Sequence, residues 1–153
     1  MPNGQQKVIE FNCRFGDPET QPIMLRLESD LVELCLKACD GKLDEVKSQW
    51  KPKASLGIVL AAEGYPGDYR KGDEISGLPQ SAVENEKVFL AGVEAKAGKL
   101  VTNGGRVLCV TALGESVFEA QQKALKLAEQ IQWNGRFYRR DIGYRALARE
   151  QKK

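Results

Sequence analysis

The chain has 153 residues, of which 42% are hydrophobic and 29% are charged, and its 23 basic and 21 acidic residues leave a net charge of +2. These values fit one soluble globular domain, or one domain and a piece of another, that builds its core without cross-links. The balanced charge argues against a nucleic-acid module, and no segment resembles a secretion signal or a membrane span. We therefore expect a cytoplasmic protein that binds neither nucleic acid nor membrane.

The chain contains no histidine, and its four cysteines form no C-x-x-C pair, which argues against a zinc site. Cys35 and Cys39 lie four residues apart on a helical pattern, and we interpret them as small buried side chains in a reducing compartment. Because the commonest general acid and base is absent, any chemistry must use carboxylates, arginines, backbone groups or a metal.

Residues 8–12 predict a strand. Its polar residues Glu10 and Asn12 share one face, while Ile9 and Phe11 point to the other. Two oxygen ligands at this spacing suit a hard cation such as Mg²⁺, whose shell nucleotide phosphates commonly complete. The Asn3-Gly4 pair before this strand is typical of a hairpin with only one of its strands present, as in a segment of a longer protein. The alternative is a short disordered leader.

More polar residues follow around a glycine, namely Arg14, Asp17 and Glu19. A guanidinium beside carboxylates suits the binding of a phosphate or carboxylate group. The alternative is a solvated strand face with no ligand. The concentration of polar groups in one short stretch favours the functional interpretation.

Asp17-Pro18-Glu19 also predicts a helix start, followed by an apolar stripe through Leu27 and Leu34 that ends at Asp40-Gly41. The pattern is interrupted near Ser29-Asp30. A short helical turn is expected within 43–53. Strands are then expected at 54–62, 75–78, 88–93, from 100 to 102, and at 106–113.

A second helix is expected after Ser116, because Ser116 and Glu119 have the spacing of a capping box. Its buried stripe comprises Val117, Ala120, Ala124, Leu127 and Ile131. A turn at Asn134-Gly135 and a last short helix from Gly143 complete the chain. Together these elements predict an α+β fold, a mainly antiparallel sheet with helices packed on one side.

Asn103-Gly104-Gly105-Arg106 offers a second candidate site. Consecutive glycines expose backbone N–H groups that bind anions, and Arg106 adds a fork of donors. The alternative, which the spacing alone favours, is a plain hairpin turn or bulge with an exposed arginine. The 64–69 loop and the 139–141 segment are interpreted as ordinary loop and surface.

Four blocks of the sequence, residues 8–35, 54–75, 102–114 and 137–147, resemble the carboxy-terminal portion of the phosphoribosylamine–glycine ligases, also called glycinamide ribonucleotide synthetases. Members of this ATP-grasp family join glycine to 5-phosphoribosylamine through a glycyl phosphate, with release of ADP and phosphate. The resemblance implies that residues 1–40 end an ATP-grasp domain, contributing its last metal-binding strand and the following helix, and that residues 41–153 form the ligase's C-terminal domain.

By the same resemblance, Glu10 and Asn12 match ligands of Mg²⁺ or Mn²⁺ at the phosphates of ATP. Arg14 and Asp17 match catalytic positions, and Glu19 matches the substrate side of that site. The glycine turn matches a wall of the ribonucleotide pocket, which makes Gly104, Gly105 and Arg106 candidate substrate contacts.

The sequence departs from the family pattern at Leu90, where histidine is expected, and it lacks the amino-terminal domain, the lid and the lysines that hold ATP phosphates. We therefore expect a truncated segment that is inactive alone and that can self-associate through the exposed edge of its first strand. The alternative is a stand-alone binding or interaction module derived from the enzyme.

Overall fold

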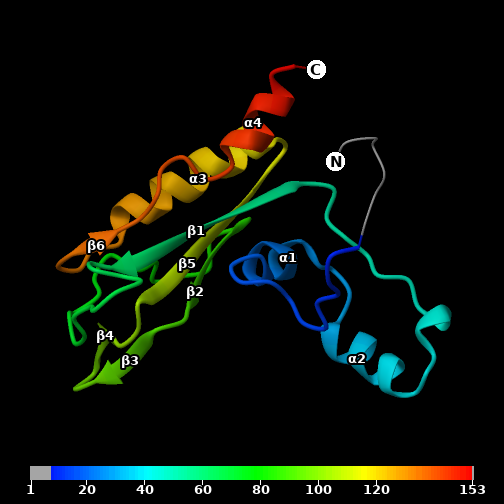
Figure 1. The fold of residues 1–153 in the computed structure, drawn as a ribbon, viewed down its shortest axis with the longest axis horizontal. Helices are drawn as coiled ribbons and strands as arrows, with labels where there is room; N and C mark the ends of the chain where they lie inside the picture. Colours follow the sequence, from blue (N-terminus) through cyan, green and yellow to red (C-terminus); the bar gives the residue numbers. More distant parts are fainter. Residues whose placement is uncertain (1–7, 153) are drawn as a thin grey trace.

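The computed structural model describes residues 8–152, so the hairpin predicted around Asn3-Gly4 lies outside it. Within this range the chain forms four α-helices, one short 3-10 helix and six strands (Figure 1). In chain order these are α1 (Thr20–Arg26), α2 (Leu31–Cys39), the 3-10 helix η1 (Leu43–Glu45), β1 (Ala54–Ala62), β2 (Glu86–Leu90), β3 (Val93–Lys96), β4 (Lys99–Thr102), β5 (Arg106–Gly114), α3 (Val117–Gln130), β6 (Arg136–Phe137) and α4 (Tyr144–Glu150).

The larger sheet has the strand order β2-β5-β1-β6, and all of its neighbours are antiparallel. In the central pair, Ile58 lies opposite Val110 and Leu60 lies opposite Leu108. The register then shifts, so that Ala61 faces Arg106. This β-bulge lies at the start of β5, where it changes the direction of the strand next to Arg106.

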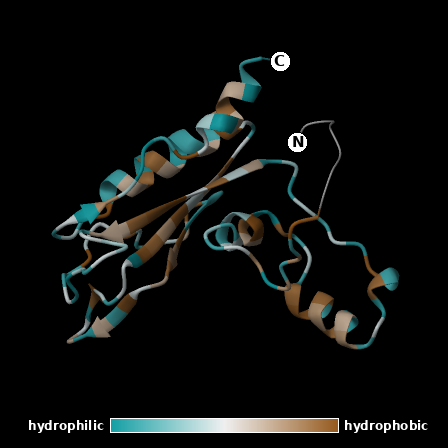
Figure 2. Cartoon of the chain, in the orientation of Figure 1, coloured by the Kyte–Doolittle hydropathy of each residue, from teal (hydrophilic) through white to brown (hydrophobic). Residues whose placement is uncertain are grey.

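Helix α3 covers one face of this sheet and forms the core with it (Figure 1). Figure 2 shows hydrophobic residues concentrated along β1 and β5. Four of the five residues of the predicted α3 stripe are confirmed as buried: Ala120, Ala124 and Ile131 are fully buried and Leu127 nearly so. Val117 is only partly buried. Small alanines let the helix backbone approach the strands closely, which suits the sheet's β-branched and leucine side chains.

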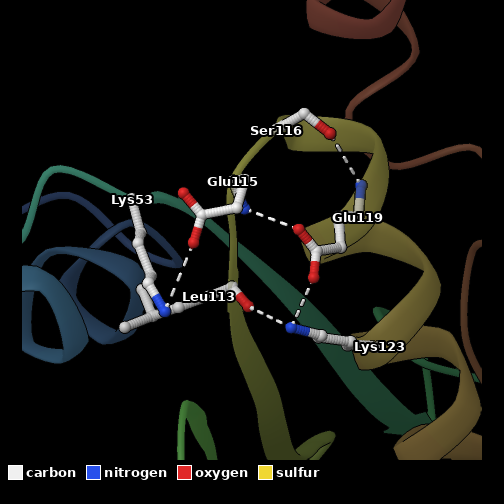
Figure 3. A network of polar contacts seen from close by, with 6 residues as sticks. All are labelled: Lys53, Leu113, Glu115, Ser116, Glu119 and Lys123. Atoms are coloured by element: carbon white, nitrogen blue, oxygen red, sulfur yellow. Dashed lines mark hydrogen bonds and ion pairs between the residues drawn. The ribbon is translucent and has the colours of Figure 1, made fainter.

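The capping box at the start of α3 is confirmed with one change of partner (Figure 3). Ser116 Oγ accepts the N–H of Glu119 at 3.1 Å. The Glu119 carboxylate accepts the N–H of Glu115 at 2.7 Å rather than that of Ser116, and it pairs with Lys123 Nζ at 2.7 Å. Lys53 reaches Glu115 at 3.4 Å, which ties the approach to β1 to this helix start.

The first predicted helix is two helices, because the expected interruption near Asp30 is complete. The Asp30 side chain accepts the N–H groups of Val32 and Glu33 and so caps α2. Glu19, rather than Asp17, is the residue that precedes α1. The Asp30 cap explains the break, because its carboxylate satisfies N–H groups of α2 that have no partner within the helix.

Helix α1 packs on the face of the sheet opposite α3, so the expectation that helices lie on one side is wrong. A side chain added at Gly57 in β1 would meet both Pro22 Cγ, at 3.0 Å, and Cys109 Sγ, at 3.1 Å. Glycine at this position therefore lets α1 approach β1 closely. Neither α1 nor α2 contains a fully buried residue.

Cys35 and Cys39 on α2 are exposed, so the interpretation that they are buried is wrong; the buried cysteine is Cys109 in β5. The apolar stripe of α2 does not face the sheet in this structure. Leu36, for example, is 62% exposed. An amphipathic pattern predicts which face is apolar, but it does not supply the surface that covers that face.

Residues 8–12 do not form the predicted strand, because no other described segment pairs with them. The 75–78 strand is reduced to an isolated bridge at Ser76, since Gly77 turns the chain with a φ of +74°. The 88–93 strand breaks at Ala91-Gly92, where the chain leaves β2 and enters β3.

Strands β3 and β4 form a separate hairpin whose turn residues, Ala97 and Gly98, have φ angles of 50° and 76°. Positive φ at both positions is the geometry of the tight turns that suit hairpins. Residues 103–105 then lead from β4 to β5, in the other sheet, so they are not the turn of a hairpin. No helix in the 8–152 range has the length and apolar character needed to cross a membrane.

Candidate functional site

A cavity of about 390 Å³ lies on the sheet face opposite α3, and we call it the Arg106 cavity. Its floor consists of Gly57, Val59 and Ala61, which share one face of β1 because alternate residues of a strand point the same way. Four segments that are distant in sequence form its walls. They contribute Asp17, Pro18, Tyr65, Pro66, Arg106, Phe137, Tyr138, Arg139 and Ile142.

Arg106, the first residue of β5, is held from two sides. Its Nε donates to Tyr65 Oη at 2.6 Å, and its Nη1 lies 2.6 Å from Asp17 Oδ2. The hydrogen bond to Tyr65 and then the charge of Asp17 raise the pKa of Arg106 above its ordinary value. The guanidinium is therefore a fixed positive charge at the edge of the cavity.

The chain next to Arg106 is shaped to receive the ring of Tyr65. A side chain at Gly105 would collide with the Tyr65 ring and would lie 3.0 Å from Tyr69 Cε1. A side chain at Gly104 would lie 2.8 Å from the Cα of Gly92. The two glycines thus permit close approach of an aromatic ring and of another backbone segment.

One backbone donor of the predicted anion cradle already has a partner, since Asn103 N–H donates to Gly92 O at 2.7 Å. What the 103–106 segment presents to the cavity is therefore the side chain of Arg106. The described geometry assigns no anion to the N–H groups of Gly104 and Gly105.

A second cavity of about 260 Å³ lies on the other side of the Asp17–Arg106 pair. Thr20 and Gln21 of α1 line it together with Cys109 of β5. Burial raises the pKa of the Cys109 thiol, so it remains protonated at neutral pH and is a poor nucleophile. Both residues of the ion pair line both cavities, as does Val59.

The predicted metal pair lies apart from the Arg106 cavity. Asn12 Nδ2 is 3.4 Å from Glu10 Oε1, so the two side chains are neighbours, and both are exposed. The flanking apolar residues Ile9 and Phe11 are 89% and 85% exposed. Within the described residues no group of three or more Asp, Glu, Cys or His side chains converges as a metal site would require.

Two other predicted residues make only local contacts. Arg14 Nη1 donates to the carbonyl of Phe15 at 3.0 Å, and Glu19 Oε1 accepts the N–H of Gly16 at 2.8 Å. Both contacts are exposed. They shape the turn before α1, and they leave Asp17 as the residue of this turn that reaches the sheet.

The structure thus brings together Asp17 and Arg106, with Gly104 and Gly105 beside them, and leaves Glu10, Asn12 and Arg14 outside. The sequence interpretation missed Tyr65 and Arg139, because the 64–69 and 139–141 segments read as ordinary loop and surface. A signal was present in the first of these segments: two tyrosines flank a Pro-Gly pair in Gly64-Tyr65-Pro66-Gly67-Asp68-Tyr69.

Arg139 adds a second guanidinium to the Arg106 cavity. It makes a bidentate contact with Asp141, at 2.9 Å from Nε and 2.6 Å from Nη2, and this hydrogen bonding and charge raise its pKa. Beside it, the guanidinium carbons of Arg136 and Arg140 lie 5.0 and 5.5 Å from the centroid of the Tyr138 ring. Arg140 in turn pairs with Glu129 at 2.9 Å, so acidic partners balance part of the positive charge on this side of the cavity.

Comparison with known proteins gives a consistent set of relatives. The family model described as "Phosphoribosylglycinamide synthetase, C domain" matches residues 55–145. The phosphoribosylamine–glycine ligase of Haemophilus influenzae is 88% identical over 153 residues, which are 100% of this chain and 36% of that protein. The ligase of Pasteurella multocida is 83% identical over 151 residues, which are 99% of this chain and 35% of that protein.

A solved structure gives the same relationship. The crystal structure of phosphoribosylamine–glycine ligase from Thermotoga maritima matches with a TM-score of 0.77 and 42% identity, over 92% of this chain and 34% of that one. The chain therefore spans about a third of the length of the relatives that it matches.

Proposed function

The chain belongs to the phosphoribosylglycinamide synthetase family, and we propose that it supplies the carboxy-terminal part of a phosphoribosylamine–glycine ligase. In the complete enzyme, glycine takes the γ-phosphoryl group of ATP to give glycyl phosphate and ADP. The amine of 5-phosphoribosylamine then attacks the glycyl carbonyl and releases phosphate, which forms glycinamide ribonucleotide. This reaction belongs to purine biosynthesis.

One observation carries the proposal: identity of 88% extends over the whole chain to a protein named phosphoribosylamine–glycine ligase. The Arg106 cavity is consistent with it. A cavity with two arginines and an aspartate suits a ligand that carries a phosphate or carboxylate group together with an amine.

We assign the candidate residues as follows. Asp17 and Arg106 face the substrates across the Arg106 cavity, with Asp17 in the catalytic group and Arg106 binding an anionic group of the substrate. Gly104 and Gly105 act by allowing close approach of other groups. Arg14 is assigned a catalytic role and Glu19 a role in substrate binding. Because both residues make only exposed contacts in this chain, these roles require the remaining domains of the ligase to complete the pocket.

Glu10 and Asn12 would hold Mg²⁺ or Mn²⁺. Their donors are a carboxylate and an amide oxygen on neighbouring side chains, a set that fits a hard cation whose remaining ligands are phosphate oxygens and water. When bound, such an ion neutralises charge on the nucleotide phosphates. This chain's contribution is the pair of oxygen ligands.

We assign residues 1–40 to the end of an ATP-grasp domain and residues 41–153 to the C-terminal domain. The difference in burial supports this division, since the core lies in the sheet and α3, while α1 and α2 contain no buried residue. The matched C domain begins at residue 55, within the second of the two parts.

The isolated chain should lack turnover, because stabilising the transferring phosphoryl group requires the metal and a cationic clamp on ATP together. The test uses the Haemophilus influenzae ligase with its matching 36% replaced by this chain. We expect glycine-dependent ADP release from this chimera and none from the chain alone. An inactive but folded chimera would refute the assignment to this ligase, and turnover by the chain alone would refute its incompleteness.

The remaining domains of the ligase are the proposed partners of this chain, together with ATP, glycine and 5-phosphoribosylamine as ligands. Without those domains, the exposed Val8, Ile9 and Phe11 favour self-association. Sedimentation of the chain over a range of concentrations tests this, and a strictly monomeric profile would contradict it.

A further inference from the structure

Arg106 is shared between two residues that come from different parts of the chain. Tyr65 lies in the loop after β1, and Asp17 lies in the turn before α1. A guanidinium carries five N–H donors in a rigid plane, so fixing it at two of its nitrogens fixes the direction of the others. Within the described residues, the Nη2 donors have no hydrogen-bond partner.

Tyr65 contacts Arg106 through both a hydrogen bond and the face of its ring. The distance of 2.6 Å from Arg106 Nε to Tyr65 Oη is short for an N–H···O bond, and the guanidinium carbon is 5.6 Å from the Tyr65 ring centroid. Gly105 leaves room for the ring directly beside Arg106. The centroid of the Tyr69 ring lies 6.3 Å from that of Tyr65, and the two ring planes are tilted by 60°.

We propose that Tyr65 is a positioning residue: its hydroxyl fixes Arg106 Nε so that the remaining guanidinium donors meet the phosphate of the ribonucleotide substrate in the Arg106 cavity. Asp17 offsets the charge of Arg106 when no substrate is present. This inference rests on the proposed function, and it specifies the phosphate ester as the substrate group that Arg106 recognises.

The charge and the size of the cavity favour a phosphate ester over the carboxylate of glycine as the group that Arg106 binds. Two guanidinium groups, those of Arg106 and Arg139, line a volume of about 390 Å³, which is large for the two carbons of glycine. A phosphate ester carries up to two negative charges and has three terminal oxygens, which suits a lining that contains two guanidinium groups better than a singly charged carboxylate does. The apolar floor of β1 accommodates the rest of the ligand.

The chain supplies a matched control for the hydroxyl of Tyr65. Arg145 Nε donates to Tyr144 Oη at 2.9 Å, and its guanidinium carbon lies 5.6 Å from the Tyr144 ring centroid. This pair reproduces the Arg106–Tyr65 contact on the exposed surface of α4, away from the Arg106 cavity. Tyr144→Phe therefore removes the same kind of hydrogen bond without touching the cavity.

The experiment measures the steady-state kinetics of Tyr65→Phe, Tyr144→Phe and Arg106→Gln in the chimeric ligase. For Tyr65→Phe we expect KM for 5-phosphoribosylamine to rise about tenfold, the usual effect of losing a hydrogen bond to a charged group, with KM for ATP and glycine unchanged. Tyr144→Phe should match the unsubstituted chimera in all three constants. Thermal unfolding verifies that each variant is folded.

A double-mutant cycle separates positioning from direct binding. If Tyr65 acts through Arg106, Tyr65→Phe has no further effect once Arg106→Gln is present. Additive effects, or a Tyr65→Phe variant that is indistinguishable from Tyr144→Phe, would overturn the inference while an active chimera leaves the proposed function standing. An inactive chimera would instead refute the proposed function and this inference with it.

Discussion

Arg106 Nη1 lies 2.6 Å from Asp17 Oδ2, and this ion pair joins the first residue of β5 to the turn that precedes α1. The two side chains are 40% and 66% exposed, so water screens their attraction. The pair is therefore better suited to meeting a ligand than to holding the fold together.

The first prediction concerns the contribution of this pair to stability. Asp17→Asn should lower the free energy of unfolding by less than about 1 kcal/mol, because exposed ion pairs contribute little. Urea unfolding of the chain measures the change, and Asp141→Asn, which breaks another exposed pair, is the control. A loss of several kcal/mol at Asp17 would mean that the pair is a structural support for α1.

A second prediction compares a buried leucine in the sheet with an exposed leucine on α2. Leu60 is completely buried in β1. Leu60→Ala should lower the free energy of unfolding by about 2–5 kcal/mol, because burial is lost and a cavity is left behind. Leu36 on α2 is 62% exposed, so Leu36→Ala should lower the free energy of unfolding by less than about 0.5 kcal/mol. Equal losses at the two positions would show that α2 is covered in solution.

The contrast between Leu60 and Leu36 also explains how far the sequence predicts the fold. Strong periodic patterns were sufficient for β1, β5 and α3, because each buries its apolar face against the others within this chain. The pattern of α2 is just as regular, yet its apolar face is exposed. Periodicity predicts an element and its apolar side, whereas burial depends on which surfaces are present to cover it.

The candidate site shows the same difference between what a local sequence pattern predicts and what depends on tertiary contacts. Asp17 and Arg106 were each predicted from local chemistry, but nothing in the sequence predicted that they meet, because their contact depends on how α1 lies across β1 and β5. Tyr65 was missed because its role comes from one hydrogen bond to a residue of another strand. The strand at 8–12 was wrong because alternation predicts the two faces of a strand and does not provide a partner.

A third prediction concerns the cysteines. Cys13, Cys35 and Cys39 are exposed, whereas Cys109 is buried and burial raises its pKa. Burial shields the Cys109 sulfur and leaves less of the reactive thiolate, so Cys109 should react with iodoacetamide more slowly than the other three. Mass spectrometry of timed samples gives the rates. In urea all four rates should converge, and fast labelling of native Cys109 would contradict its burial.

A fourth prediction follows from the start of α3 and gives a pH dependence. Hydrogen bonding to Lys123 and then to the N–H of Glu115 lowers the pKa of Glu119. A carboxyl whose pKa is lower in the folded state stabilises the fold above its unfolded pKa of about 4.3, and this stabilisation is lost as the pH falls through the folded value. Glu119→Gln should therefore be less stable than the unsubstituted chain at pH 7, and the difference should shrink in acid.

The urea midpoint measured at several pH values checks this prediction. Glu94→Gln, an exposed substitution on β3, is the control and should follow the unsubstituted chain throughout. A difference between Glu119→Gln and the unsubstituted chain that stays constant down to acid pH would mean that Glu119 acts through packing rather than charge.

The last prediction tests the metal assignment of Glu10. In the chimeric ligase, Glu10→Gln should reduce kcat by at least about tenfold and raise the Mg²⁺ concentration needed for half-maximal rate, because an amide is a weaker ligand for a hard cation than a carboxylate. In the isolated chain the same substitution should leave the urea midpoint unchanged, since Glu10 is exposed and its described contact is with Asn12. Glu28→Gln, at another exposed position, should change neither quantity. If Glu10→Gln lowers stability and turnover together, Glu10 is a structural residue, and the metal assignment is refuted.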